Sequence, residues 1–204
     1  MLRLCQPTLL IQRGSGFVHN LKPITALSGD QPRVETIGTV TLTENPGLAL
    51  ASVSARLGRE DACKKHLKAV IGAVPGPGEA QLNDPEAGFW MAPNCWMVGA
   101  PFDTHEDLAD QLKARFKDCA SITEQTDAWV CFDLQGADIE DVMERLCPIH
   151  IRAMKTGQGT RTFIDHIGCF VLRCAPSDWV RILGPRSSAG SLCHALITAM
   201  KSVA

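Results

Sequence analysis

Two pairs of cysteine and histidine are the residues in this 204-residue chain whose types and spacing could bind a metal. Cys147 and His150 form a Cys-x2-His pair, and His166 and Cys169 form a His-x2-Cys pair after fifteen intervening residues. Two thiolates and two imidazoles are a complete tetrahedral zinc set. His166 and Cys169, however, fall within a predicted strand, where residues three apart point to opposite faces. We therefore prefer a buried cysteine at a helix end and a partly buried histidine on a strand, and keep zinc as the alternative.

Other motifs give little indication of chemistry. The glycine-rich stretches at residues 75–78 and 157–159 neither directly follow a predicted strand nor open a helix, as phosphate-binding loops do. The chain has no Gly-x-Ser-x-Gly motif, and no spacing of Ser, His and Asp indicates a triad, although a dispersed triad would leave no such trace. The four tryptophans are favoured as core residues, because three of them lie on predicted alternating strands. We expect no catalytic and no cofactor-binding residues in this chain.

Composition limits the partners and the compartment. The net charge is −2, from 20 basic and 22 acidic residues spread along the chain, which predicts neither nucleic-acid binding nor binding to an anionic membrane. No uncharged apolar run approaches the roughly 18 residues of a spanning helix. The nine cysteines are odd in number and most lie in apolar stretches, so we expect free thiols in the cytoplasm.

The elements that must position these residues follow an internal repeat. An Ala-Pro dipeptide, a Trp three residues after the Pro, and a Gly and Pro after a short apolar run occur at residues 92–101 and again at 175–185. Each copy is predicted to be a turn and a strand, followed by a capped amphipathic helix. A repeat at about half the chain length indicates two versions of one unit.

Periodicity predicts the elements of each unit. The first is expected to contain a hairpin, a helix, a strand pair and a second helix, at residues 34–42 with 48–55, 60–71, 89–91 with 96–98, and 104–117. The second is expected to contain a strand, a short helix, a long strand and its hairpin partner, and a last helix, at residues 127–134, 139–147, 162–173, the repeat near 179, and from 188. Thr104 and Ser187 or Ser188 are the expected helix caps, and Gly168 marks an expected bulge or bend.

Both halves therefore have the order strand, helix, strand, strand, helix. This order predicts an α+β fold of two related βαββα, ferredoxin-like units packed together, with helices covering one face of a mixed sheet. The expected division is an N-terminal arm at residues 1–30, a first unit at 31–120 and a second unit at 121–204. The first unit can take a further strand from residues 127–134 and the second from the N-terminal hairpin, so interleaving into one domain stays open.

Several segments together resemble one known family. The run at residues 184–192, GPRSSAGSL, resembles the closing motif of the gamma subunit of heterotetrameric sarcosine oxidase, in which Arg-Ser-x-Ala leads into a final helix. Matching segments occur at residues 41–44, the strand at Trp96, 127–130, 134–136, 146–148 and 161–162, so the resemblance covers roughly residues 21 to 204. The chain departs from the pattern at His150, where Asp is usual, and at Cys193, where an aromatic residue is usual.

The resemblance implies a non-catalytic gamma subunit with a role in assembly, and a fold like the folate-binding domains of aminomethyltransferases. It implies alpha, beta and delta subunits as partners, in a complex that oxidatively demethylates sarcosine to glycine, with hydrogen peroxide and a one-carbon unit as further products. FAD, FMN, NAD, tetrahydrofolate and zinc are then expected in the other subunits, and no cofactor in this one. The alternatives are the equivalent subunit of an N-methylglutamate dehydrogenase and a free-standing folate-binding protein.

A subunit of this kind needs a partner surface, and the N-terminal arm is the first candidate. Residues 1–29 contain no acidic residue, and their apolar side chains have no core of their own. The interface candidates in the arm are Leu9, Leu10, Ile11, Phe17 and Val18. Arg186 is the second candidate, because a cation at a helix start is unfavourable unless a carboxylate meets it. A carboxylate of its own chain is the alternative partner for Arg186.

Overall fold

The computed structural model describes residues 23–175 and 178–204. The strands are β1 (Val34–Ile37), β2 (Val40–Glu44), β3 (Leu48–Ala55), β4 (Ala80–Gln81), β5 (Ala87–Ala92), β6 (Cys95–Pro101), β7 (Ala120–Glu124), β8 (Trp129–Gly136), β9 (Gly159–Ile164), β10 (Ile167–Ala175) and β11 (Trp179–Pro185). The helices are α1 (Glu60–Ile71), α2 (Phe102–His105), α3 (Leu108–Phe116), α4 (Ile139–Leu146) and α5 (Ala189–Val203), with the 3₁₀ turns η1 (Thr126–Ala128), η2 (Ile151–Ala153) and η3 (Arg186–Ser188).

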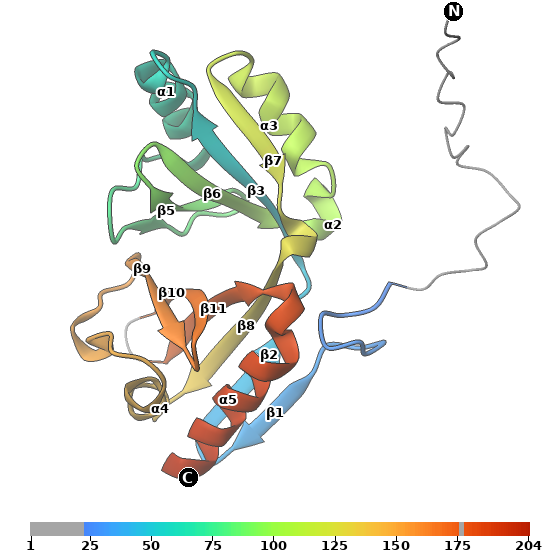
Figure 1. Ribbon diagram of the computed structural model, residues 1–204, viewed down its shortest axis with the longest axis vertical. Coiled ribbons are helices and arrows are strands. Elements are labelled where there is room, and N and C mark those ends of the chain that lie inside the picture. Colours follow the sequence, from blue (N-terminus) through green and yellow to red (C-terminus); the bar gives the residue numbers. More distant parts are fainter. Residues whose placement is uncertain (1–22, 176–177) are drawn as a thin grey trace, which may run out of the picture.

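The strands form two sheets that lie one above the other (Figure 1). The first sheet has the order β1-β2-β8-β11-β10-β9 and the second has the order β4-β5-β6-β3-β7. Every pairing between the described strands is antiparallel, so the expected mixed sheet is wrong. The reason is the position of the third strand: β6 lies between β3 and β5, and β11 lies between β8 and β10, so the strands joined by a helix are never neighbours.

The internal repeat is confirmed by this topology. The order β5-β6-β3-β7 in one sheet corresponds to β10-β11-β8-β2 in the other, as expected for two ferredoxin-like units. The two repeated hairpins also share an irregularity. The register shifts between Trp90 and Ala92 in the first hairpin and between Arg173 and Ala175 in the second, close to the tip in each case.

The chain passes from one sheet to the other differently from the prediction. Residues 34–42 and 48–55 do not form a hairpin, because β2 pairs with β1 and β8 whereas β3 pairs with β6 and β7. The further strand of the first unit is β7 and not residues 127–134, which form β8. The N-terminal region does supply a strand to the second unit, namely β2. The chain passes from the larger sheet to the smaller one at residues 45–47 and back at residues 125–128. The predicted domain boundaries at residues 30 and 120 stay a prediction.

The single long strand predicted at residues 162–173 is in fact parts of two strands, β9 and β10, which pair as a hairpin. Asp165 and His166 both have a positive φ, of 48° and 66°, which lets a two-residue turn join β9 to β10. Two-residue turns of this kind usually contain glycine, and Asp-His does not, so the indication of the turn in the sequence was only weak. Gly168 does not form the expected bulge, because it pairs in regular register with Phe163.

The helix caps also differ in part. Thr104 lies inside the short helix α2, where its hydroxyl donates to the carbonyl of Pro101, and α3 starts separately after Asp107. Ser188 is at the N-cap of α5 but makes no side-chain cap hydrogen bond. Asp138 is at the N-cap of α4 and likewise makes no side-chain cap hydrogen bond.

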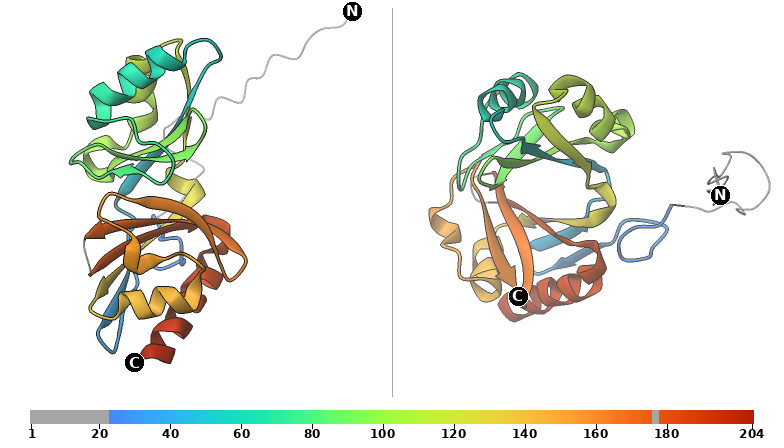
Figure 2. Two further views of the ribbon diagram at one scale, coloured as in Figure 1. Left: turned by 90° about the vertical axis from the view of Figure 1, so that its left-hand side faces the viewer. Right: turned by 45° about the horizontal axis from the view of Figure 1, so that its top comes forward.

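Helices cover the outer face of each sheet, and the inner faces meet (Figures 1 and 2). The core under α4 and α5 includes Phe132 and Leu196, and the core under α1 and α3 includes Leu67 and Phe116. A third, smaller core joins the two sheets, where the rings of Phe89 and Phe170 lie 5.0 Å apart. Successive side chains of a central strand therefore point alternately into the core under the helices and into the core between the sheets. A polar residue on the inner face is buried, so it needs a hydrogen-bond partner.

Candidate functional site

The structure does not bring the four residues of the alternative zinc set together. Cys147 follows α4 and Cys169 lies on β10, and both are buried in the core under the helices. His150 is exposed ahead of η2, and His166 is exposed in the β9–β10 turn. Within residues 23–175 and 178–204, no group of three or more His, Cys, Asp or Glu side chains could hold a metal ion. Burial raises the pKa of the Cys169 thiol to about 11 and also raises that of Cys147.

The two glycine-rich stretches bind each other. The amide of Ala80 donates to the carbonyl of Gly157 at 2.8 Å, and the amide of Gly159 donates to the carbonyl of Gly78 at 3.1 Å. An isolated bridge joins Glu79 to Gln158 between them. These amides are therefore used in joining the two units, and the loops do not present them to a phosphate.

A polar cluster on the inner face of the larger sheet was not predicted from the sequence. Asp133 on β8 accepts two hydrogen bonds from Arg181 on β11, one from the indole of Trp179 and one from the amide of Asn45. The Arg181 guanidinium also lies 5.4 Å from the centre of the Trp179 ring. Burial alone would lower the pKa of Arg181, but its hydrogen bonds to Asp133 raise it overall. The one available signal was an aspartate in the middle of a predicted strand.

A cavity of about 190 Å³ lies beside this cluster, between the sheets. Its walls are mostly apolar, and Arg181 and Asp84 are the charged residues that line it. Cavities that bind drug-sized ligands usually measure about 300–1,000 Å³. The space between the sheets is therefore small for a ligand of that size, and Arg181 already has a carboxylate partner.

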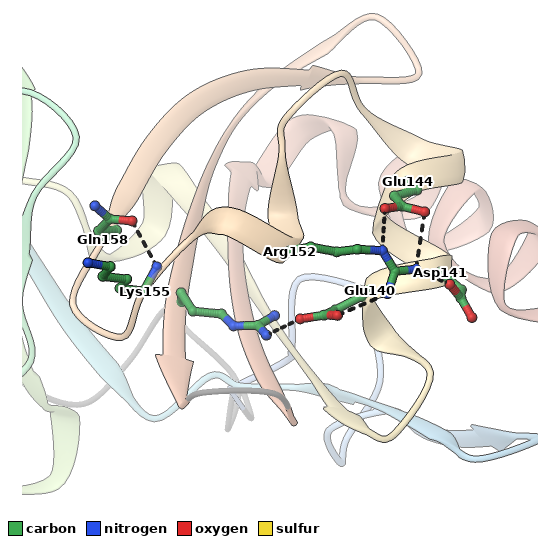
Figure 3. A network of polar contacts seen from close by, with 7 residues as sticks. Glu140, Asp141, Glu144, Arg152, Lys155 and Gln158 are labelled. Atoms are coloured by element: carbon green, nitrogen blue, oxygen red, sulfur yellow. Dashed lines mark hydrogen bonds and ion pairs between the residues drawn. The ribbon is translucent and has the colours of Figure 1, made fainter.

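A second charged cluster fixes the loop after α4 (Figure 3). Arg152 lies in η2 and pairs with Glu140, Asp141 and Glu144, which all belong to α4. Glu140 also binds the buried Arg173 of β10, at 2.5 Å. Hydrogen bonds to Glu144 and Asp141 raise the pKa of Arg152, and the pKa of Glu144 is lowered. The cluster holds residues 147–158 against the helix and so positions the loop that joins the two units.

The interface candidates in the arm lie outside the described residues, but Arg186 does not. Its guanidinium is 3.4 Å from Asp127 and donates to the carbonyl of Ile24 at 3.2 Å. Of the two partners considered for Arg186, the structure shows the one within its own chain. A role at a partner interface stays a prediction.

The segment that leads from the arm into β1 is fixed by a buried carboxylate. Glu44, which is 2% exposed, accepts hydrogen bonds from the amides of Leu27 and Arg33. Together with Arg186, this carboxylate fixes the chain where it approaches the first strand.

Next to this segment, a cavity of about 450 Å³ surrounds the connection between β2 and β3; we call it the linker groove. Its apolar walls include Ile24, Leu48, Phe102 and Trp129, and Pro23 lies at its edge. It is the larger of the two cavities described so far, and it lies at the point where the chain passes between the sheets.

Comparisons with known proteins give similarity in structure only. No model of a protein family and no curated protein matches the sequence. Among solved structures, a chain of the heterotetrameric sarcosine oxidase from Corynebacterium sp. U-96, in complex with pyrrole 2-carboxylate, matches with a TM-score of 0.70 and 23% identity, over 83% of this chain and 87% of that chain. The glycine cleavage system aminomethyltransferase T from Bartonella henselae matches with a TM-score of 0.61 and 18% identity, over 79% of this chain and 46% of that chain. The chain thus shares the fold of both and spans less than half of the second.

No helix among the described residues is long and apolar enough to span a membrane.

Proposed function

We propose that this chain is the non-catalytic gamma subunit of a sarcosine oxidase-type complex, with a role in assembly. The observation that carries the proposal is the match to a chain of heterotetrameric sarcosine oxidase, which covers 83% of this chain and 87% of that one. Two chains that each match over more than four fifths of their length have about the same size and share a fold. The aminomethyltransferase match leaves more than half of that enzyme without a counterpart.

The chemistry of the inner face supports a role without catalysis. Asp133 and Arg181 neutralise each other, and the neighbouring indole and amide are also bonded to Asp133. A catalytic acid or base instead needs a proton that it can exchange with a substrate. Burial raises the pKa of the thiols of Cys63, which is buried, and Cys174, which is half-buried, to about 11, so both are poor nucleophiles at neutral pH.

Under this proposal, the oxidation of the N-methyl amine takes place on the partner subunits, alpha, beta and delta. Those subunits hold FAD, FMN, NAD, tetrahydrofolate and zinc, and this chain holds none of them. The cysteines of the described residues are free, and most are buried, which is in keeping with a reducing cytoplasm as the site of the complex.

Affinity purification tests the proposal directly. An affinity-tagged copy of the chain, expressed in its own cell at its natural level, is expected to co-purify with larger chains that carry bound flavin. A complex that oxidises sarcosine supports the assignment, whereas one that oxidises only N-methylglutamate indicates the equivalent subunit of that dehydrogenase. A chain that purifies alone, with no flavoprotein bound, contradicts the proposal.

A free-standing folate-binding protein is the second candidate, because the chain shares its fold with an aminomethyltransferase. Isothermal titration of the isolated chain with tetrahydrofolate separates the two. Stoichiometric binding, together with purification free of partners, would replace the subunit assignment. Absence of binding by the isolated chain is what the subunit assignment predicts.

A further inference from the structure

The linker groove is apolar because its polar groups already have partners. The carboxylate of Glu44 receives two backbone amides, and the side-chain amide of Asn45 binds Asp133. The indole of Trp129 donates to Gln125 at 3.2 Å. The exposed carboxylate of Asp127, which also lines the groove, pairs with Arg186. The rest of the wall is the hydrocarbon of residues such as Leu48, Leu50 and Phe102, so an occupant that fills the groove must bring apolar side chains.

An acidic surface continues from this groove. A wide hollow of about 720 Å³ is lined by residues of α2, α3 and β7. Its lining contains five carboxylates and one ammonium group, from Asp103, Glu106, Asp107, Asp110, Glu124 and Lys113. The groove and the hollow adjoin, since Phe102 lines the first and Asp103 the second. An occupant that extends across both must carry positive charge.

Residues 1–22 combine apolar side chains with positive charge, and the chain continues from them into the groove lining at Pro23. The segment contains Arg3, Arg13 and Lys22 and no acidic residue, and its apolar side chains include Phe17 and Val18. The first described residue after it is Pro23, at the edge of the groove. An extended chain advances about 3.3 Å per residue, so Phe17 lies within roughly 20 Å of Pro23 and can reach the groove without strain.

We propose that residues 1–22 bind in the linker groove of their own chain, with Phe17 and Val18 against its apolar walls and the basic residues of the segment facing the acidic hollow. The intrachain contact goes beyond the proposed function and does not depend on it, whereas its consequence for assembly rests on that function. Because an arm fixed in this way no longer has to be ordered when a partner binds, the groove lowers the entropic cost of assembly. The groove is then the part of this chain that presents the arm to a partner.

Photo-crosslinking in the full-length chain tests the proposal. A benzophenone amino acid replaces Phe102, a half-buried aromatic residue of the groove, and the irradiated monomer is digested and mapped by mass spectrometry. The expected product is an intrachain crosslink to a peptide from residues 1–22. The same photoreactive residue in place of the exposed Glu106 provides a second position if the Phe102 variant does not fold.

Two controls make the result decisive. The photoreactive residue at Phe163, which is 65% exposed on the opposite edge strand β9, is expected to give no crosslink to residues 1–22. Combining the substitutions Arg13→Glu and Lys22→Glu is expected to lower the yield at Phe102 at least fivefold in low salt. Crosslinks from Phe102 and Glu106 only to a second copy, or to no part of residues 1–22, would overturn the proposal. An equal yield from Phe163 would also do so.

Discussion

Arg181 and Asp133 lie directly opposite each other on the neighbouring strands β11 and β8, and they form a two-pronged ion pair on the inner face of the larger sheet. The Nε–Oδ1 and Nη2–Oδ2 distances are 2.7 and 2.9 Å, and the side chains are 19% and 11% exposed. This fork geometry is the strongest form of the arginine–carboxylate interaction. Removing one member leaves the other charge buried without compensation.

The substitution Asp133→Asn is therefore expected to destabilise the chain by about 3 kcal/mol in urea unfolding. The matched control is Asp110→Asn, which breaks an exposed pair with Lys113 and is expected to change stability by less than about 0.5 kcal/mol. Equal effects of the two substitutions would show that the inner pair is not a structural anchor.

The charged cluster on α4 predicts a shifted titration. The hydrogen bonds from Arg152 lower the pKa of Glu144, so the folded state binds its proton less tightly than the unfolded state does. The resulting stabilisation is present above the ordinary pKa of a glutamate and is lost as the pH falls through the lowered value. In an NMR titration, Glu144 is expected to have its midpoint below that of an ordinary glutamate, and Arg152→Ala is expected to return it to the ordinary value. An unchanged midpoint in this variant would contradict the assigned cause.

Gly136 at the end of β8 cannot carry a side chain. Its φ is 140°, and a Cβ atom would lie 2.0 Å from the carbonyl oxygen of Thr39. We expect Gly136→Ala to destabilise the chain by more than about 2 kcal/mol in thermal or urea unfolding. Gly190 in α5 is the control, because a Cβ there meets no atom within 4 Å. Gly190→Ala is expected to be neutral or to stabilise by up to about 1 kcal/mol, and a similar loss in both variants would refute the steric argument.

The isolated chain is expected to be colourless and metal-free. The four residues of the alternative zinc set lie in different environments, two buried and two exposed. Elemental analysis of the purified chain checks this expectation. Stoichiometric zinc that is lost in Cys147→Ala or His166→Ala would restore the metal site.

Deletion of residues 1–20 is expected to weaken assembly while the chain stays folded. Losing the contacts of two apolar side chains with the partner subunits, such as those of Leu9 and Leu10, would cost about 3 kcal/mol, or roughly a hundredfold in the dissociation constant. Circular dichroism checks the fold, and titration with the partner subunits measures the affinity. Assembly at the affinity of the intact chain, or unfolding of the truncated chain, would count against a docking arm.

The sequence by itself determined several of the elements and their repetition. Alternation in residues 127–134 predicted β8, and helical spacing in residues 60–71 predicted α1. Both predictions worked because side chains on one face recur every second residue in a strand and every three to four residues in a helix. The two Ala-Pro-x-x-Trp segments predicted the equivalent hairpins, since Pro and the turn residues act locally.

Only the tertiary structure decided which strands pair and which polar residues meet. The local pattern of residues 34–55 predicts two strands joined by a turn, but whether the second strand pairs with the first depends on the burial offered by β8 and β6, which are far along the chain. In the same way, Asp133 meets Arg181 after 47 intervening residues, and Arg186 meets Asp127. Such contacts leave no periodic pattern in the sequence from which they could be predicted. They depend on how the elements pack, and the order of the elements in space differs from their order in the chain.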